Sequence, residues 1–503
     1  MQYKNPIVPG FHPDPSVCRV GSDYYLVNSS FEFFPGVPLF HSKNLIDWTQ
    51  IGHVLDRKSQ LNLTGCWTSG GIFAPTIRYN NGRFYMVTTN VTHGGNFYVW
   101  TDDINSGWSD PVFVDQGGID PSLFFDDDGT VYFASTCTDD EGKSCIGQCT
   151  IDIETGEKLE ETRVLWHGTG GKCPEGPHMY KINGKYYLML AEGGTEYGHM
   201  ETISRSDSPW GSWESCPHNP ILTNREQDIR PEVLHALGHA DLIEDEGGQW
   251  WILFHGIRTT QFMLHHIGRE TMIAPVSWED GWPVVNNTKN VGIDMSTDRN
   301  LPASTKTTFE THDKFSSDKL ICEWSFLRNP NESCYSFGNG NGLIMSPSDC
   351  DVEGKGSPTW IGRRQQHMNM STNVMLDYNP KAETDEAGIN IFHTKEHHYD
   401  LVISRKNGKK VCFLRKRVAD ILVESVPIEI SDDEHLNLII ESDSLEYRFY
   451  INTQSAGKKL IGTGSTQLVS TECMVCTFTG CFVGMFVNGC EKLIAKSFDY
   501  ISI

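Results

Sequence analysis

The sequence lacks any apolar run that approaches the roughly twenty residues a helix needs to cross a bilayer. It is also poor in positive charge, because 41 Lys and Arg stand against 65 Asp and Glu, a formal net charge of −24 at pH 7. Nucleic acids and anionic lipid surfaces do not attract a polyanion. These absences argue against nucleic acid and membrane partners, and they give no positive evidence of function.

The opening residues, Met1 to Pro6, lack the apolar stretch of a signal peptide. We therefore expect a cytoplasmic protein, or a secreted one if a leader has been removed. The 15 cysteines show no tight, paired framework, which favours reduced, packed thiols. With 503 residues, the chain is too long for one typical domain.

The first half of the chain contains five strand hairpins that recur roughly 45 to 65 residues apart. Each has a Gly-containing turn followed by an aromatic, β-branched run of the kind that suits a pleated, half-buried surface. No amphipathic helical pattern separates the hairpins, so a parallel α/β fold is not expected. The pattern predicts an all-β fold, a five-bladed β-propeller with one blade per repeat. The five runs are Asp23–Val27, Arg83–Val87, Thr130–Ala134, Lys185–Met189 and Gln249–Leu253.

Three acidic phrases precede these hairpins at matching places: His-Pro-Asp-Pro-Ser at 12–16, Ile-Asp-Pro-Ser at 119–122 and Pro-Glu-Gly-Pro at 174–177. The equivalent position of each propeller blade faces one central channel. Asp14, Asp120 and Glu175 are thus expected to meet at the channel mouth, beside Ala74 and His239 of the other two repeats. A single Asp-Pro phrase often only caps a turn, but three acids in register favour a functional site.

The repeat ends near residue 283, and a polar segment follows it. The later strands alternate apolar and polar residues without the repeat, which is typical of a two-sheet sandwich. The sequence predicts a catalytic propeller over 1–297, a linker over 298–308 and a jelly-roll-like or concanavalin-like β-sandwich over 309–503.

Two carboxyl groups in one pocket are the minimum for glycoside hydrolysis. One protonates the leaving oxygen and needs a raised pKa, which a neighbouring anion can supply. The other activates water or attacks carbon, and it needs a polar setting that keeps it ionised. A third carboxylate could tune and orient the acid.

The ordered motifs resemble those of glycoside hydrolase family 43, in its β-xylosidase and α-L-arabinofuranosidase branch. The resemblance covers essentially the whole first half, and the second half resembles the β-sandwich of the xylosidase branch through a weaker signature at 477–485. It rests on the residues Pro9–Ser16, Ser29–Pro38, Ile72–Tyr79, Gly118–Ser122, Pro174–Pro177, Ala191–Thr195, Gly238–Leu242 and Gly268–Thr271.

The resemblance implies Asp14 as general base, Glu175 as general acid and Asp120 as the residue that modulates the pKa of the acid and orients it. It also implies inversion at the anomeric carbon, with base and acid about 6.5–9.5 Å apart to admit water. No cofactor is required for such a reaction.

Four more residues are expected to bind substrate. Arg269 matches a pocket arginine whose donors could hold sugar hydroxyls, although it could instead form a structural salt bridge with Glu270. Phe31 and Phe73 match positions that line the sugar subsite, or could be ordinary core residues; Phe73 stands where tryptophan is more common. Thr195 belongs to the Ala191–Thr195 motif.

His239 matches a histidine near a calcium ion or water cluster on the propeller axis of similar enzymes. A structural, water-mediated Ca²⁺ is therefore an open alternative, although calcium prefers oxygen ligands.

The implied function is exo-hydrolysis that releases single pentoses, xylose and perhaps arabinofuranose, from non-reducing ends of xylo-oligosaccharides. The alternatives are an α-L-arabinofuranosidase acting on arabinoxylan or arabinan, and a non-catalytic carbohydrate-binding propeller. A fructan-acting hydrolase shares the architecture but would carry an Asn-Asp-Pro-Asn-like motif. Homo-oligomers are common among similar enzymes.

Overall fold

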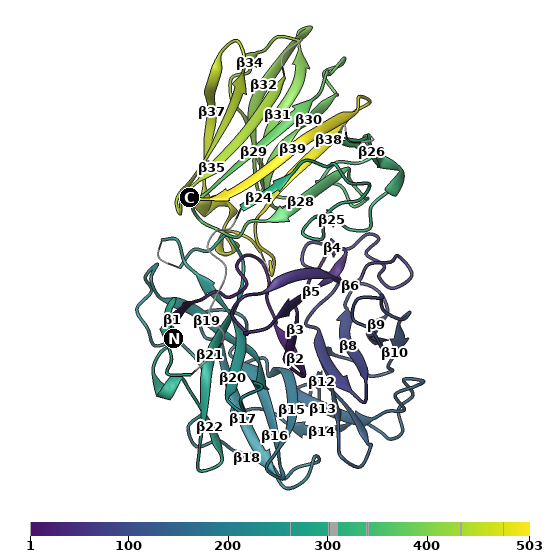
Figure 1. The fold of residues 1–503 in the computed structure, drawn as a ribbon, viewed down its shortest axis with the longest axis vertical. Coiled ribbons are helices and arrows are strands. Elements are labelled where there is room, and N and C mark those ends of the chain that lie inside the picture. Colours follow the sequence, from purple (N-terminus) through teal and green to yellow (C-terminus); the bar gives the residue numbers. More distant parts are fainter. Residues whose placement is uncertain are drawn as a thin grey trace.

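The computed structural model describes residues 2–261, 263–299, 301, 310–338, 340, 342–432, 435–475 and 477–503. Two β-rich bodies are stacked along the long axis of the molecule (Figure 1). The purple-to-teal half of the chain forms five four-stranded sheets, and the green-to-yellow half forms two larger sheets. This architecture confirms the predicted five-bladed propeller followed by a β-sandwich.

Each propeller blade is an antiparallel sheet whose strands follow one another in the chain. The blades are β2 (Ser16–Val20), β3 (Asp23–Val27), β5 (Gly36–Ser42) and β6 (Thr49–Leu55); β7 (Thr76–Asn80), β8 (Arg83–Asn90), β9 (Gly95–Thr101) and β10 (Val112–Phe113); β11 (Ile119–Phe125), β12 (Val131–Thr138), β13 (Ser144–Thr150) and β14 (Arg163–Trp166); β15 (Glu175–Ile182), β16 (Lys185–Glu192), β17 (Met200–Ser206) and β18 (Glu214–Ser215); and β19 (Leu234–Glu244), β20 (Trp250–Arg258), β21 (Glu270–Glu279) and β22 (Trp282–Val285).

The hairpin turns have the backbone that their residues favour. Asn81 and Gly82, between β7 and β8, both have positive φ, 49° and 88°, as a type I′ turn requires. This turn type matches the twist of the flanking strands, so the short Asn-Gly pair fixes the register of the blade.

The first and last strands of the propeller half of the chain form a two-stranded sheet, in which β1 (Gln2–Lys4) pairs with β23 (Asp294–Ser296). The first strand of the sandwich, β24, begins at Glu310. Most of the expected linker, residue 300 and residues 302–308, lies outside the described residues.

The sandwich consists of two sheets. One is ordered β26-β27-β39-β29-β35-β36-β37, with β24 on β39, and the other is ordered β33-β32-β31-β30-β38-β28-β25-β4, with β34 on β32; β4 (Phe33–Phe34) comes from the first half of the chain. Its strands are β24 (Glu310–Asp313), β25 (Ser325–Leu327), β26 (Tyr335–Phe337), β27 (Leu343–Met345), β28 (Trp360–Arg364), β29 (Met370–Asp377), β30 (Glu386–Thr394), β31 (His397–Lys406), β32 (Lys409–Val418), β33 (Ile421–Glu424), β34 (Ile428–Glu429), β35 (Leu436–Ser442), β36 (Glu446–Thr453), β37 (Gly457–Ser465), β38 (Phe482–Asn488) and β39 (Leu493–Ser502). Side chains alternate between buried and partly exposed along β29 and β35, as expected where one face covers a core.

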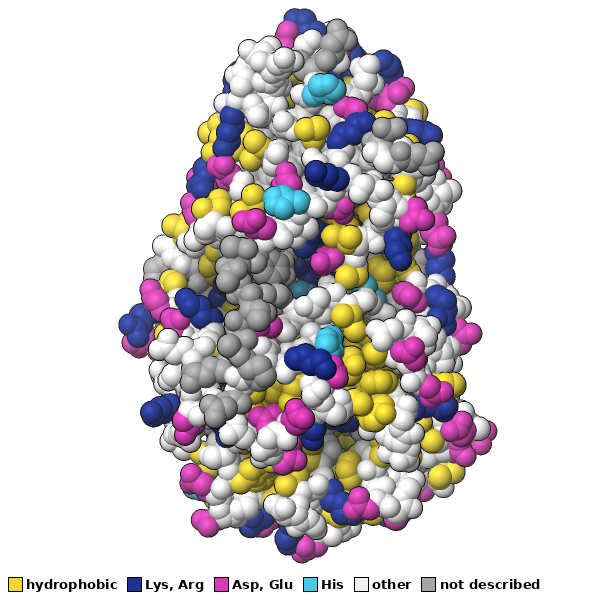
Figure 2. Space-filling view, in the orientation of Figure 1, with side chains coloured by type: hydrophobic (Ala, Val, Ile, Leu, Met, Phe, Trp, Pro, Cys, Tyr) yellow, Lys and Arg dark blue, Asp and Glu magenta, His cyan; other side chains and the backbone are white. Residues whose placement is uncertain are grey.

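The described residues contain only short 3-10 helices, Asn286–Thr288, Glu332–Cys334, Thr466–Val469 and Thr471–Cys473. Within this described part, no helix has the length and apolar character needed to span a membrane. Acidic and basic side chains are mixed over the face drawn in Figure 2.

The sandwich is docked on the propeller through a shared strand and a shared aromatic core. β4 (Phe33–Phe34) leaves the first blade and pairs with β25 of the sandwich. Phe33 also stacks on Phe482 of β38, with ring centroids 4.1 Å apart. Burial of these rings favours close packing of the two domains, so loops of the sandwich lie at the propeller face that carries Asp14.

A buried ion pair ties the inner strands of the propeller together. The Asp241 carboxylate accepts hydrogen bonds from Ser16 Oγ at 2.7 Å, Arg78 Nη1 at 2.8 Å and Tyr180 Oη at 2.6 Å. These four residues belong to four different blades. Although burial alone would raise the pKa of Asp241, the Arg78 guanidinium and His178 hold that pKa below its usual range.

Replacement of Asp241 by alanine should destabilise the propeller by about 3–5 kcal/mol, because it leaves the Arg78 cation buried without its partner. We expect a clearly lower melting temperature by differential scanning calorimetry. Asp294→Ala, which removes the exposed partner of Lys4, is the control and should leave the melting temperature nearly unchanged. Equal melting temperatures for the two variants would show that the buried pair does not stabilise the blades.

Candidate active site

All eight residues that the sequence singled out line one pocket at the channel mouth of the propeller. They are Asp14, Phe31, Phe73, Asp120, Glu175, Thr195, His239 and Arg269, and the pocket wall is completed by Ala74, Ile119 and Phe478. The inner strands of the five blades converge here, as the repeat predicts. Phe478 comes from the sandwich domain, so both domains form the pocket.

A local distortion of the inner strands aims their side chains into the pocket. Asp14, Asp120 and His239 have positive φ angles of 53°, 55° and 52°, an uncommon conformation for residues other than glycine. In the fourth blade the positive φ, 57°, falls on Gly176. Such strained backbone is typical of functional sites.

Glu175 lies one residue earlier in its strand than the matching of the three acidic phrases predicted. In the third blade the pairing of the inner strand with its neighbour is interrupted directly after Ile119, and in the fourth blade it is interrupted directly after Glu175. Glu175 is therefore the structural equivalent of Ile119, and Gly176 that of Asp120. A side chain at position 176 would meet the His239 ring, since a Cβ there would lie 2.9 Å from Nε2. Glycine is required at this position, and the acid reaches the pocket from the neighbouring position.

Asp14 is a buried carboxylate surrounded by donors. Its Oδ1 lies 2.8 Å from Arg269 Nη1 and 3.0 Å from His255 Nδ1, and its Oδ2 accepts a short hydrogen bond from Ser29 Oγ. Burial alone would raise the pKa of Asp14, but Arg269, His239 and His255 hold that pKa well below its usual value. Asp14 is therefore ionised at neutral pH.

Glu175 has the opposite environment. Burial and the Asp14 anion raise the pKa of Glu175 to about 7, although Arg269 and Lys172 act in the opposite direction. This carboxyl group can keep its proton near neutral pH, as a general acid must. Burial and the Asp14 anion are the larger causes of the raised Glu175 pKa. The sequence had instead predicted that Asp120 raises it.

Asp120 is itself held toward its neutral form. Burial, Glu175 and Asp14 all raise the pKa of Asp120 well above its usual value. Its carboxyl group accepts a hydrogen bond from the backbone N–H of Gly176, the residue that follows Glu175. Asp120 is therefore placed to orient the strand end that carries Glu175.

Arg269 points into the pocket and does not pair with Glu270, whose carboxylate lies 2.6 Å from Arg258 Nε. Besides Asp14, the Arg269 guanidinium donates to Thr195 Oγ1 at 3.0 Å and to the Phe478 carbonyl at 3.3 Å. One cation thus links the buried carboxylate, the wall of the pocket and the sandwich domain.

Three phenylalanines form an aromatic wall. The Phe31 ring lies 5.3 Å from that of Phe73 and 5.9 Å from that of Phe478, measured between centroids. Phe31 is buried, whereas Phe73 and Phe478 are partly exposed. Such a wall can pack against the C–H face of a sugar ring.

Sequence reasoning missed His255 and Phe478. His255 lies in β20, within the apolar run Trp250–Ile257, and a histidine in such a run was the available signal. Phe478 follows Phe31 by more than 400 residues in the chain, so only the docking of the domains brings the rings together.

Among the described residues, the side chains around His239 do not form a direct calcium shell, and the water-mediated calcium stays a prediction. Its Nδ1 lies 3.7 Å from Asp14 Oδ1 and its ring is 5.8 Å from that of His255. The Arg269 cation shares the same carboxylate. Over the described residues no group of three or more His, Cys, Asp or Glu side chains is arranged to hold a metal, and calcium favours a shell of six to eight oxygens.

Comparison with known proteins gives matches over both halves. The family described as glycosyl hydrolases family 43 matches residues 3–283, and a "Beta xylosidase C-terminal Concanavalin A-like domain" matches residues 312–503. The fructan-hydrolase alternative, which rested on a different motif set, is thereby set aside.

Two curated relatives match along nearly their whole length. A non-reducing end α-L-arabinofuranosidase of Bacteroides ovatus, BoGH43B, is 41% identical over 97% of this chain and 91% of its own. A β-xylosidase of Bacillus subtilis is 31% identical over 96% of each chain. Among solved structures, that described as "Bacteroides ovatus Xyloglucan PUL GH43B" has a TM-score of 0.94 and 39% identity, covering 100% of both chains.

Replacing Arg269 by methionine should raise the pKa of Asp14 above the ordinary aspartate value of about 3.9, because burial then acts with less opposing charge. The measurement is a ¹³C carboxyl titration of protein labelled at aspartate, with the Asp14→Asn spectrum as assignment control. An unchanged Asp14 titration in Arg269→Met would mean that the histidines and Ser29 alone keep the carboxylate ionised.

Proposed function

Because the chain belongs to glycosyl hydrolase family 43, we propose that it is an inverting, exo-acting glycosidase that releases single pentose units from the non-reducing ends of xylo-oligosaccharides. The observation that carries the proposal is the unlike state of two carboxyl groups in one pocket. Asp14 is held ionised, whereas burial and Asp14 raise the pKa of Glu175 to about 7, so that a large share of Glu175 keeps its proton near neutral pH. These are the two states that single displacement requires.

In this reaction the Asp14 carboxylate removes a proton from a water molecule, and the water oxygen attacks the anomeric carbon. The bond to the leaving oxygen breaks as Glu175 donates its proton to that oxygen. Asp120 orients Glu175 through Gly176, and Arg269 and Thr195 bind hydroxyl groups of the sugar. Phe31, Phe73 and Phe478 enclose the ring and exclude water.

Exo action is supported by the contribution of both domains to one small pocket. Phe478 of the sandwich lies opposite Phe73 of the propeller, with ring centroids 6.1 Å apart. A closed wall of this kind suits the end of a chain and a single sugar unit.

The pentose could be xylose or arabinofuranose. The Bacteroides ovatus relative is named an arabinofuranosidase and the Bacillus subtilis relative a β-xylosidase. The greater identity to the former supports α-L-arabinofuranosidase as the second candidate function. Phe73, where tryptophan is more common, also leaves the subsite open to either ring.

A rate comparison on 4-nitrophenyl β-D-xylopyranoside and 4-nitrophenyl α-L-arabinofuranoside tests the substrate class. We expect hydrolysis of at least one, and proton NMR of the first product should show inverted anomeric configuration.

Asp14→Ala is expected to lower kcat by about 10²–10⁴-fold, the usual contribution of a positioned general base. Full activity in this variant would remove the general-base role from Asp14, and inactivity of the wild type on both glycosides would remove the pentose assignment.

The pH dependence of kcat/KM tests the division between acid and base. Glu175 must be protonated, so the rate should fall as the pH rises through about 7. Asp14 must be ionised, so the acid limb should lie below the usual aspartate range.

In Glu175→Ala the alkaline limb of the pH profile should disappear. The rate of hydrolysis of 2,4-dinitrophenyl glycosides, whose leaving group needs no acid, should fall much less in this variant than the rate on xylobiose. An alkaline limb that persists in this variant would assign the acid role elsewhere.

A further inference from the structure

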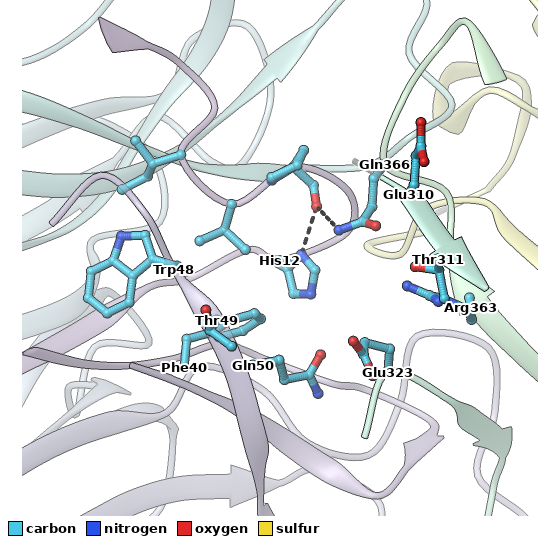
Figure 3. Close-up of a pocket in the computed structure, with 13 residues that line it drawn as sticks. His12, Phe40, Trp48, Thr49, Gln50, Glu310, Thr311, Glu323, Arg363 and Gln366 are labelled. Atoms are coloured by element: carbon cyan, nitrogen blue, oxygen red, sulfur yellow. Dashed lines mark hydrogen bonds between the residues drawn. The ribbon is translucent and has the colours of Figure 1, made fainter. Parts of the chain in front are cut away.

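A second cavity lies between the two domains, behind the segment that carries Asp14. Its volume is about 230 Å³. A single water needs only about 10–15 Å³ measured in this way. The walls include His12, Phe40 and Gln50 from the propeller and Glu323, Arg363 and Gln366 from the sandwich (Figure 3).

Arg363, on β28, is a buried cation without a partner among the described residues. Its side chain lines the cavity and the residue is only 3% exposed, yet no hydrogen bond or ion pair joins its guanidinium to any described residue, and Nη1 is buried and unpartnered. Burial lowers the pKa of Arg363, and Glu323 opposes this only at longer range. A buried charge of this kind needs hydrogen-bond acceptors.

Within the described part of the chain, His12, on the propeller side of the cavity, lacks the opposite kind of partner, a hydrogen-bond donor. Its Nδ1 lies 3.1 Å from the Pro9 carbonyl, which requires the proton on that nitrogen, so Nε2 carries a lone pair. Nε2 is buried and has no partner among the described residues. Burial and the Arg364 charge lower the pKa of His12 well below its usual value, so the ring is neutral. This nitrogen needs a hydrogen-bond donor.

An occupant of the cavity should therefore offer both a hydrogen-bond acceptor for Arg363 and a hydrogen-bond donor for His12. A hydroxyl group can accept from Arg363 and donate to His12, whereas an anion would face the carboxylates of Glu310 and Glu323. A metal cation would face Arg363. Phe40 and Trp48 add an apolar wall that suits C–H groups, and Thr49 and Glu310 are exposed at the mouth.

We propose that this interdomain cavity is a second binding site, separate from the catalytic pocket, for a small neutral polyhydroxy compound of monosaccharide size. An occupant would join the two domains beside Pro9, whose carbonyl already accepts a hydrogen bond from Gln366 at 3.4 Å. It would thereby stabilise the docked sandwich and the segment that leads to Asp14.

The test is thermal denaturation of the full chain with xylitol, phosphate or CaCl₂, together with crystals soaked in xylitol. Xylitol should raise the melting temperature in a saturable way, and phosphate and calcium should not. The rise should be lost in Arg363→Met and kept in Arg230→Met, an exposed arginine outside the cavity, and in Asp14→Ala, which alters the catalytic pocket. Soaked crystals should show xylitol contacting Arg363 and His12.

Three results would overturn the proposal: only water in the cavity of soaked crystals, a xylitol effect that vanishes in Asp14→Ala but survives in Arg363→Met, or equal stabilisation by phosphate. If Arg363→Met does not fold, His12→Phe, which keeps a ring but removes the acceptor nitrogen Nε2, serves instead and should weaken the xylitol effect. Crystals of the wild type decide the question in either case.

Discussion

The ion pair between Arg269 and Asp14 is the interaction on which the active pocket depends. A carboxylate that is only 4% exposed would normally take up a proton. The cation, together with His255 and Ser29, keeps it ionised. The resulting anion raises the pKa of Glu175 and Asp120. One fixed charge therefore sets the states of three neighbouring carboxyl groups, with Asp14 ionised and Glu175 and Asp120 held toward the neutral form.

The same arginine explains why the sandwich domain is part of the site. Its guanidinium donates to the Phe478 carbonyl, and its charge lies 5.9 Å from the centre of the Phe31 ring and 5.8 Å from that of Phe478. The shared strand β4 and the Phe33–Phe482 stack hold the two domains in this arrangement. The pocket exists only in the docked protein, which makes the domain interface a functional element. The polyol site proposed at that interface would act on the same arrangement.

The fold and most of the pocket could be predicted from the sequence because the propeller repeats its geometry. Asn81-Gly82 and its counterparts mark the hairpins, and equivalent positions then converge on one axis, which brings Asp14, Asp120 and His239 together. The predicted match of Glu175 to Asp120 was wrong by one residue, because the positive φ falls on Gly176 and sequence spacing does not reveal a backbone distortion. The pocket position of Phe478 and the cavity position of Arg363 could not be predicted, because they depend on how two domains pack and no local pattern encodes that packing.

The central claim is that the empty pocket near pH 6 holds one ionised carboxyl group, on Asp14, and two protonated ones. Neutron diffraction from deuterium-exchanged crystals at this pH locates the protons directly. The account predicts deuterium on the carboxyl groups of Glu175 and Asp120 and none on Asp14. Deuterium on Asp14, or a bare carboxylate at Glu175, would contradict it.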